Sequence, residues 1–449
     1  MKKGWEKAGA LGIAVILTMG MLTGCGGVEN GNGTQNTQEQ TTENVQKEES
    51  SEGVSSDVTL EVEVIYTGDP LEQFRGVLDD FTSQTGIGIE LITPGSDYES
   101  VMKTRMASGD MPDVFVTHGW SLIRYKEYLT PLTDEEWYEK IDDAILPVIS
   151  DDGGDIYVLP VTQQVNGIVY NKNVLENAGV DPADIRTMDN FMEACEKIKA
   201  SGVTPFFVGG KDTWTAATVY NAFSPAYYTT EGCIYPSGDA LKDGSFDWDT
   251  YGSCVLEQIA QMVQEGYMNT DLVTADNAAT MTALGNDNCG FSTEVEIAKV
   301  LNVAPEAQLG IMPIPCTTEE GKSQYMIGEG SCFGIWKDTE NMDAAREFLN
   351  YLSQPEVANR IMSLDGGLPA LEGMDASNVT YQAFLDSQTT FEGDIFYDNL
   401  FDREYLPNGM YNAQMDAVIE VFMDPSETGV EAGLEILKST FEDKYMAQE

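Results

Sequence analysis

The stretch Val116–Ser121, VTHGWS, contains the only histidine among the 449 residues, His118, and a tryptophan two positions later, Trp120. A histidine can serve as the general base of a Ser-His-Asp hydrolase, whereas a tryptophan ring offers a flat apolar surface on which a ligand can stack. The Gly-x-Ser-x-Gly turn that carries the serine of α/β-hydrolases does not occur in the chain. We therefore expect Trp120 to supply a binding surface and His118 at most a hydrogen bond.

Alternating strands and helices are predicted to position this stretch. The segment 58–66 alternates apolar and polar side chains with the period of a β-strand, and 70–85 places apolar residues along one face of a helix. The short apolar run 114–116 is typical of a buried strand and directly precedes the histidine and tryptophan. Ligands of open α/β sheets bind beyond the carboxyl ends of the strands. The loop that follows this run is therefore predicted to lie at the ligand-binding edge.

The first 57 residues predict a leader and a tether rather than part of the fold. The apolar run 8–22 follows three lysines and is too short to span a bilayer, but it fits the core of a signal peptide. It ends in Leu22-Thr-Gly-Cys25, which resembles the lipobox of bacterial lipoproteins and implies a lipid on Cys25. The alternative is an ordinary secretory signal with a chance cysteine. Residues 26–57 are polar, lack aromatic side chains and predict a disordered tether. We expect a protein anchored at the extracellular face of the bacterial cytoplasmic membrane.

The charge and the cysteines of the chain exclude several partners. There are 24 Lys and Arg against 75 Asp and Glu, a formal net charge of −51. Nucleic acid is excluded because its binding depends on basic side chains that neutralise phosphates, whereas a neutral ligand meets no such penalty. No Cys-x-x-Cys pair occurs among the cysteines after Cys25, and there is a single histidine. No zinc site and no other cofactor is therefore expected.

Short motifs spread over residues 58–370 resemble those of one protein family and occur in the family's order. They are Thr85-Gly-Ile87, Ser108-Gly-Asp-Met-Pro-Asp-Val-Phe115, Leu129-Thr-Pro-Leu-Thr133, Gly154-Asp-Ile-Tyr-Val-Leu-Pro160, Gly167-Ile-Val-Tyr-Asn-Lys172, Met312-Pro-Ile-Pro315 and Gly366-Gly-Leu-Pro-Ala370. The family is that of the extracellular solute-binding proteins of ABC transporters, in the carbohydrate-binding branch related to maltose-binding protein. Each motif is weak alone, and the argument rests on the ordered set behind a lipobox and a polar tether.

This resemblance implies an α/β fold of two lobes, like that of periplasmic binding proteins, with a hinge and an interlobe cleft that closes over the ligand. The chain would cross between the lobes near residues 164–168, 284–290 and 330–337. The implied limits are 58–165 and 286–335 for lobe one, and 166–285 and 336–449 for lobe two. The implied partners are a carbohydrate ligand and the permease subunits of an ABC transporter, and the protein is expected to be a monomer.

A sugar has apolar C–H faces and a rim of hydroxyl groups, so a site for it needs aromatic planes with polar groups at their edges. The predicted ligand-binding residues are Tyr66, Asp97, His118, Trp120, Gln163, Asn166, Trp214, Glu294, Glu329 and Asp365. One departure from the family concerns residues 289–294. The family often carries a Gly-x-Trp there, whereas this chain continues to Glu294. A carboxylate is therefore expected where a stacking ring would otherwise lie.

Two other functions stay open on the sequence alone. A secreted glycoside hydrolase would need two carboxylates facing each other at about 5–10 Å, and the abundance of acidic residues singles out no pair. A lipoprotein for a peptide or a polyamine would use acidic side chains more heavily. The predicted function is the capture of a carbohydrate, expected to be an oligosaccharide, without catalysis.

Among the other tryptophans, Trp137 and Trp248 are expected at the surface and Trp336 in the core.

Overall fold

The strand predicted at the start of the folded chain forms as β1, Thr59–Glu63. The computed structural model describes residues 58–95, 98–117, 125–143, 145–151, 153–293, 295–375, 377–391, 395–407 and 409–446, which all belong to one unit, Gly53–Glu449. Within these ranges the apolar side chains gather into three hydrophobic clusters, each built around or against a β-sheet.

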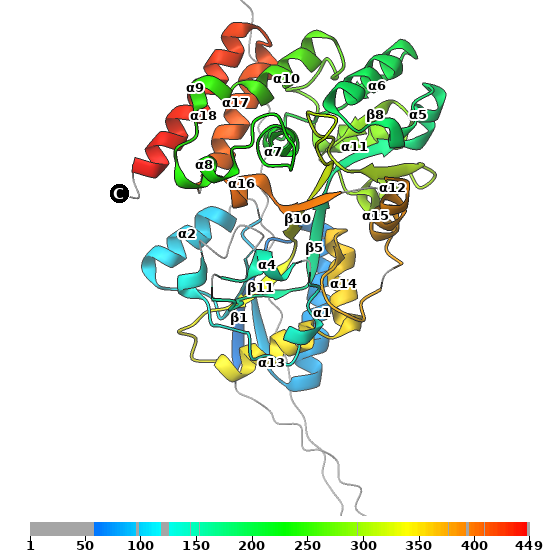
Figure 1. The fold of residues 1–449 in the computed structure, drawn as a ribbon. Coiled ribbons are helices and arrows are strands. Elements are labelled where there is room, and N and C mark those ends of the chain that lie inside the picture. Colours follow the sequence, from blue (N-terminus) through cyan, green and yellow to red (C-terminus); the bar gives the residue numbers. More distant parts are fainter. Residues whose placement is uncertain are drawn as a thin grey trace, which may run out of the picture. The chain divides into compact units, whose positions relative to one another are not determined.

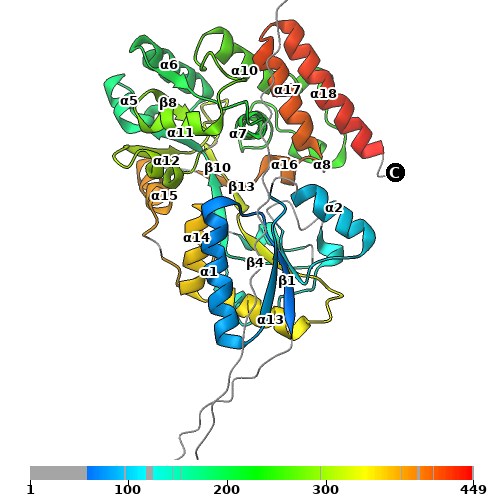
Figure 2. The ribbon, with the colours of Figure 1, turned by 180° about the vertical axis from the view of Figure 1, so that it is seen from behind.

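The first part of the chain and a later return form one cluster. Its elements are β1, α1 (Gly68–Thr85), β2 (Gly88–Ile92), α2 (Tyr98–Ser108), β3 (Val114–Val116), α4 (Leu146–Ile149), β4 (Leu159–Pro160), β11 (Cys332–Ile335), α13 (Met342–Leu352) and α14 (Pro355–Asp365). The strands form a sheet in the order β2-β1-β3-β11-β4, in which β2, β1 and β3 are parallel. Helix α1 buries Phe74, Val77, Leu78 and Phe81 and lies beside α14 (Figures 1 and 2).

A second cluster takes most of the remaining helices. Its elements are β6 (Ile168–Asn171), α5 (Lys172–Asn177), α6 (Met188–Ala200), β7 (Thr204–Phe206), α7 (Trp214–Tyr228), α8 (Gly238–Asp243), α9 (Trp248–Tyr251), α10 (Cys254–Gln264), β8 (Cys289–Ser292), β9 (Leu309–Met312), α17 (Met410–Met423) and α18 (Glu427–Met446). Helices α11 (Asn277–Gly285) and α12 (Ile297–Val303) pack instead in the third cluster, which includes Leu284, Ile297 and Val300. The strands form a sheet in the order β7-β8-β6-β9. The last two helices, α17 and α18, lie side by side and pack with α7 and α10 (Figures 1 and 2).

A third sheet joins segments that are far apart in the sequence. Its strands are β5 (Thr162–Asn166), β10 (Gln324–Glu329), β12 (Leu368–Pro369) and β13 (Phe396–Asn399), in the order β12-β5-β10-β13. Helices α15 (Val379–Thr390) and α16 (Phe401–Glu404) flank β13 in the sequence. β5 and β10 are antiparallel, so that Gln163 pairs with Glu329, and β10 and β13 are parallel. Two predicted ligand-binding residues therefore lie on neighbouring strands.

The hydrophobic clusters group the chain differently from the lobe limits expected above. Residues 289–314, expected in lobe one, pack with the second and third clusters because β8 and β9 hydrogen-bond to β6. Residues 345–362, expected in lobe two, pack in the first cluster because α13 and α14 cover β11 and α1. The segment 161–168 does lead from the first cluster to the second, close to the expected crossing at 164–168.

The expectation that Trp137 and Trp248 lie at the surface is wrong. Trp137 is 1% exposed and Trp248 is 4% exposed, and each belongs to a hydrophobic cluster. The ring of Trp248 packs edge-on against Phe246 and Phe441. Polar neighbours in the sequence suggested turns, but burial of a large aromatic side chain outweighs its polar surroundings. Trp336 is half-buried against the first cluster.

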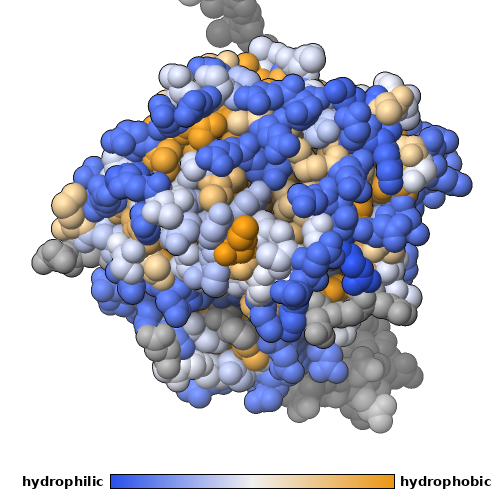
Figure 3. Space-filling model, turned by 45° about the horizontal axis from the view of Figure 1, so that its top comes forward, coloured by the Kyte–Doolittle hydropathy of each residue, from blue (hydrophilic) through white to orange (hydrophobic). Residues whose placement is uncertain are grey.

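The exterior reflects the acidic composition. On the face shown in Figure 3, hydrophilic residues dominate and apolar colour is confined to small, separate patches. Large apolar side chains that stay exposed include Trp214 and Tyr397. Among the described residues, no helix combines the length and the apolar character needed to cross a membrane.

Candidate functional site

The end of β10 is tied to two other segments by a short chain of hydrogen bonds. The hydroxyl of Tyr66, which follows β1, lies 2.9 Å from Oγ of Ser331. The backbone N–H of Ser331 donates to Oγ1 of Thr162, the first residue of β5, at 2.7 Å. A Cβ on Gly330 would lie 2.3 Å from the same oxygen, so only glycine fits between them. Tyr66 is thereby held next to the strand that carries Gln163.

Glu329 is a buried carboxylate with an unmet polar atom. Glu329 is 6% exposed, and its Oε2 has no hydrogen-bond partner among the described residues. Burial raises the pKa of Glu329 to about 7, although the positive charge of Arg403 acts to lower it and the charge of Asp402 acts to raise it. A buried carboxylate oxygen without a hydrogen-bond partner costs stability. Such a cost is typical of a site that meets its partner in a ligand.

Arg403 and Asp402 were not predicted from the sequence. Both lie in α16, and the Arg403 Nε is 3.6 Å from the Asp402 Oδ2. The Nε of Arg403 has no hydrogen-bond partner among the described residues, and burial raises the pKa of the Asp402 carboxyl. One weak signal was the rarity of basic side chains in so acidic a chain. The position of this segment beside Glu329 follows from strand pairing.

The amide of Gln163 is occupied within the protein. Its Nε2 donates to the carbonyl of Pro369 at 2.7 Å and to Oδ2 of Asp142 at 3.3 Å. The residue is 5% exposed. Asn166, at the other end of β5, is half-buried and pairs with Met326. Gln163 therefore joins strands here, and its contact with a ligand stays a prediction.

Trp214 is the first residue of α7. It is 42% exposed, and its backbone carbonyl accepts a hydrogen bond from the hydroxyl of Tyr411 in α17 at 3.1 Å. The side chain of Trp214 is not part of the second hydrophobic cluster, so it does not contribute to the core. Its exposure is what a stacking platform requires, so the proposal that it contacts a ligand stands.

Several predicted residues lie outside the part of the chain that the structure describes. They are Cys25, Asp97, His118, Trp120 and Glu294. Asp365 is the last residue of α14, and its side chain is not described. The elements that precede two of these positions are in place: β3 ends directly before Thr117 and His118, and β8 ends two residues before Glu294. Contacts of these side chains with a ligand stay predictions.

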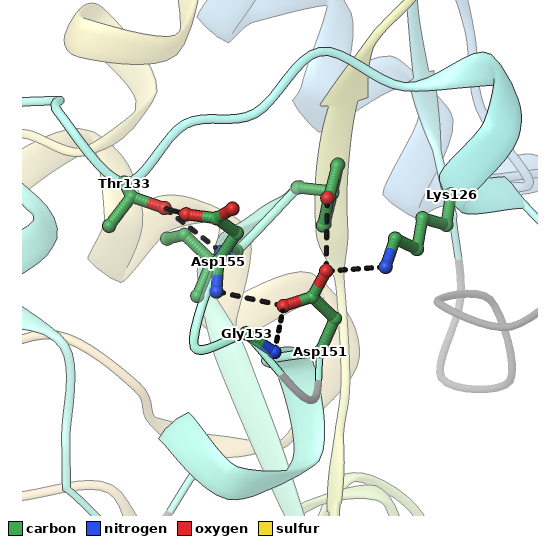
Figure 4. Close-up of polar contacts among 7 residues, drawn as sticks. Lys126, Thr133, Asp151, Gly153 and Asp155 are labelled. Atoms are coloured by element: carbon green, nitrogen blue, oxygen red, sulfur yellow. Dashed lines mark hydrogen bonds and ion pairs between the residues drawn. The ribbon is translucent and has the colours of Figure 1, made fainter.

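A polar network fixes the chain just beyond the segment that contains His118 and Trp120 (Figure 4). Oδ1 of Asp151 accepts hydrogen bonds from the backbone N–H groups of Gly153 at 2.8 Å and Asp155 at 3.0 Å, and Oδ2 pairs with Nζ of Lys126. The ammonium group and these N–H donors hold the pKa of Asp151 well below its usual range. Lys126 lies two residues after the last of residues 118–124, which the structure does not describe, so this network positions the chain that follows them.

A hollow elsewhere on the described part of the chain does not have the predicted composition. A hollow of about 350 Å³ lies between α15 and the β6–β9 edge and contains none of the predicted ligand-binding residues. It is lined by Tyr170, Lys172, Gly310, Ala383, Asp386, Ser387, Thr389 and Thr390. Within the described ranges, no group of three or more His, Cys, Asp and Glu side chains could hold a metal ion.

The fold and these residues can now be compared with known proteins. Residues 67–359 match the family described as bacterial extracellular solute-binding protein, which is more than half of the chain. The chain belongs to this family. The family predicted from the ordered motifs is confirmed, as is the two-domain α/β fold, because the structural neighbours of this solute-binding protein have that fold.

Three similar proteins from bacilli cover most of the chain. The melibiose/raffinose/stachyose-binding protein MelE of Bacillus subtilis strain 168 is 29% identical over 376 residues, which is 81% of this chain and 85% of the relative. The crystal structure of a sugar transporter protein of Bacillus licheniformis in complex with stachyose is 30% identical. It covers 86% of this chain and 100% of that chain with a TM-score of 0.77. The binding protein MsmE of Bacillus subtilis, solved in an open conformation, is 26% identical with a TM-score of 0.78, over 87% of this chain and 98% of its own.

Proposed function

We propose that this solute-binding protein captures a neutral oligosaccharide of the melibiose, raffinose and stachyose series and delivers it to an ABC transporter permease. The observation that carries the proposal is the likeness, at 29–30% identity over more than four fifths of the chain, to a melibiose/raffinose/stachyose-binding protein and to a stachyose complex. The high negative charge supports a neutral ligand, since a polyanionic sugar would be repelled.

The proposed binding surface combines an aromatic plane with buried polar groups. Trp214 offers its exposed ring for stacking on the C–H face of a sugar, and Trp120 is proposed for the same role. Glu329, Tyr66 and Asn166 would face hydroxyl groups, because carboxylates and hydroxyls match the donors and acceptors of a sugar rim. The other residues proposed to contact the ligand are Asp97, His118, Gln163, Glu294 and Asp365. The two lobes are proposed to close over the ligand between them.

The proposed location rests on motifs in residues 1–57. We infer that residues 1–24 are removed on export, that Cys25 carries the lipid, and that 26–57 tether the binding unit outside the membrane. The supporting observation is the order of basic start, apolar run, Leu-x-Gly-Cys and polar segment. Mass spectrometry of the amino-terminal peptide tests this proposal. A diacylated Cys25 supports it, and an unmodified cysteine or a cleavage elsewhere contradicts it.

Thermal shift with a ligand panel tests the proposed capture of sugars. Melibiose, raffinose and stachyose at about 100 times the dissociation constant should stabilise the native state by about 2.7 kcal/mol. Spermidine and short peptides serve as the comparison, because they represent the other ligand classes. A shift with amines or peptides and none with any sugar contradicts the proposal. Chromatography of the recovered sugar should return it intact, since no cleavage is proposed.

A further inference from the structure

We propose that Glu329 and Arg403 together form a polar subsite that binds two neighbouring hydroxyl groups of one sugar unit, with Asp402 orienting the guanidinium. This inference rests on the proposed function and deepens it, because it names the groups that distinguish one sugar from another. Neither Asp402 nor Arg403 was a candidate on the sequence, and the subsite is brought together only by the pairing of β10 with β13.

The strand register places α16 beside Glu329. β10 and β13 are parallel, and Ile327 lies opposite Asn399. Glu329 lies two residues after Ile327, so it lies beside the point where β13 ends and α16 begins. A Cβ on Gly328 would lie 2.6 Å from a side-chain atom of Leu400, so glycine allows the two segments to approach closely. The start of α16 is therefore held directly against the end of β10.

Helix α16 is itself firmly positioned, so Arg403 is not simply a mobile surface side chain. Phe401 is 1% exposed in the second cluster, and its ring stacks on those of Tyr228 and Tyr405. Glu404 accepts a hydrogen bond from Nδ2 of Asn399 at 2.7 Å and forms an ion pair with Lys242. The side chain of Arg403 is 24% exposed, and that of Asp402 is 13% exposed. The guanidinium is thus partly withdrawn from water next to a buried carboxylate.

Glu329 and Arg403 lie near enough for the charge of Arg403 to act on the pKa of Glu329, and each has one polar atom without a partner. Oε2 of Glu329 and Nε of Arg403 both lack a hydrogen-bond partner within the described chain, and neither atom bonds the other. Most buried polar atoms are satisfied, and each exception needs a reason. Asp151 shows the usual outcome, since its carboxylate is filled by backbone and side-chain donors. A group that both accepts from the guanidinium and donates to the carboxylate would satisfy both atoms at once.

A pair of sugar hydroxyls has these properties. Each hydroxyl donates one hydrogen bond and accepts others, and bonds to ionised partners are stronger than neutral ones. An anionic ligand would be repelled by Glu329 and Asp402, and a cation by Arg403. The mixed charges therefore favour a neutral ligand with adjacent hydroxyls over an acidic or basic one.

Isothermal titration of raffinose and stachyose into the unaltered protein and into Glu329→Gln tests the subsite. The substitution keeps the shape of the side chain and removes its charge. We expect the affinity to fall roughly 10- to 100-fold, the range for hydrogen bonds to charged groups. Above pH 7, where the Glu329 carboxylate is ionised, the melting temperature of the ligand-free variant should stay the same or rise, because a buried charge is removed. An unchanged affinity, or a loss of affinity accompanied by a lower melting temperature without ligand, overturns the inference.

Arg403→Gln should weaken binding to a similar degree, and the double variant should lose less than the sum of the two single losses, since both residues would hold the same sugar unit. Additive losses overturn the shared subsite. Glu63→Gln is the matched control. Glu63 is also a fully buried carboxylate with a raised pKa, but it lies 3.1 Å from Arg105 in the first cluster. Its substitution should leave sugar affinity unchanged.

The outcomes separate this inference from the proposed function. If the unaltered protein binds none of the sugars, the proposed function fails and the subsite fails with it. If the unaltered protein binds raffinose or stachyose and Glu329→Gln binds them equally well, the subsite alone fails.

Discussion

Glu329 remains protonated to a higher pH in the folded protein than in the unfolded chain. Its pKa is about 7 in the fold, against 4.5 for an ordinary glutamate. Between these values the native state holds a proton that the unfolded state has lost. The contribution of this group to stability is therefore greatest below about pH 4.5 and declines as the pH rises to 7. The decline amounts to about 3 kcal/mol at most.

Urea unfolding of the ligand-free protein between pH 5 and pH 8 measures this effect. Glu63, whose pKa is also about 7 because of its burial, contributes a decline in the same direction. Glu329→Gln should remove the part of the pH dependence of the unfolding free energy that Glu329 supplies, and leave the parts that Glu63 and Asp402 supply. An identical pH dependence in the variant would mean that Glu329 is ionised in the fold.

Trp214 is expected to contribute to ligand binding and little to folding. Because its ring is 42% exposed without ligand, Trp214→Ala should barely change the melting temperature of the free protein. Burial of the ring against a sugar is worth about 1–3 kcal/mol, so titration calorimetry should show an affinity lower by that amount. Ile234→Ala, at a residue that is 48% exposed, serves as the control. Equal affinities for the unaltered protein and Trp214→Ala would remove Trp214 from the site.

At the scale of elements, the close approach of β5 to the end of β10 depends on a glycine. Gly330→Ala places a methyl group 2.3 Å from Oγ1 of Thr162. We expect overpacking of this kind to cost about 1–3 kcal/mol in the free energy of unfolding. Gly76→Ala is the matched control, since it lies in α1 with only a flexible arginine 3.4 Å away, and alanine favours a helix. Denaturant titration should show a loss for the first variant only. Equal stabilities would contradict the described packing.

The Asp151 network is expected to stabilise the protein in a pH-dependent way. The pKa of Asp151 is held low chiefly by the ammonium of Lys126, so its stabilising contribution is present above the usual carboxyl pKa and lost in acid. Asp151→Asn should lower the melting temperature at pH 7, and the difference should shrink as the pH falls. Calorimetric scans at several pH values give this comparison. A difference that persists undiminished in acid would show that packing, and not charge, is responsible.

The elements show which features of the fold could be predicted from sequence. α1 has a clear apolar period and β3 is a short apolar run, and both form where expected because burial decides their position. The sequence did not predict which cluster β8 and β9 join. Their place is determined by hydrogen bonds to β6, and no local sequence pattern indicates this pairing. The neighbourhood of Arg403 was missed for the same reason. Trp137 and Trp248 were placed wrongly because polar neighbours hid their burial.

At the scale of the whole molecule, family and charge point to the same kind of ligand. The chain is a member of the bacterial extracellular solute-binding proteins, and two relatives near 30% identity have names that refer to raffinose-type sugars or stachyose. The formal net charge of −51 disfavours anionic ligands over the entire surface. Function was therefore predictable to the level of the family. The ligand-binding residues were harder to predict, because they come from segments that are far apart in the sequence and meet only in the folded chain.

Titration calorimetry of stachyose and raffinose into the purified protein tests the central claim most directly. A saturable, one-to-one isotherm with either sugar, and none with spermidine or a short peptide, is the predicted result. Binding of the amine or the peptide without binding of any neutral sugar would contradict the account.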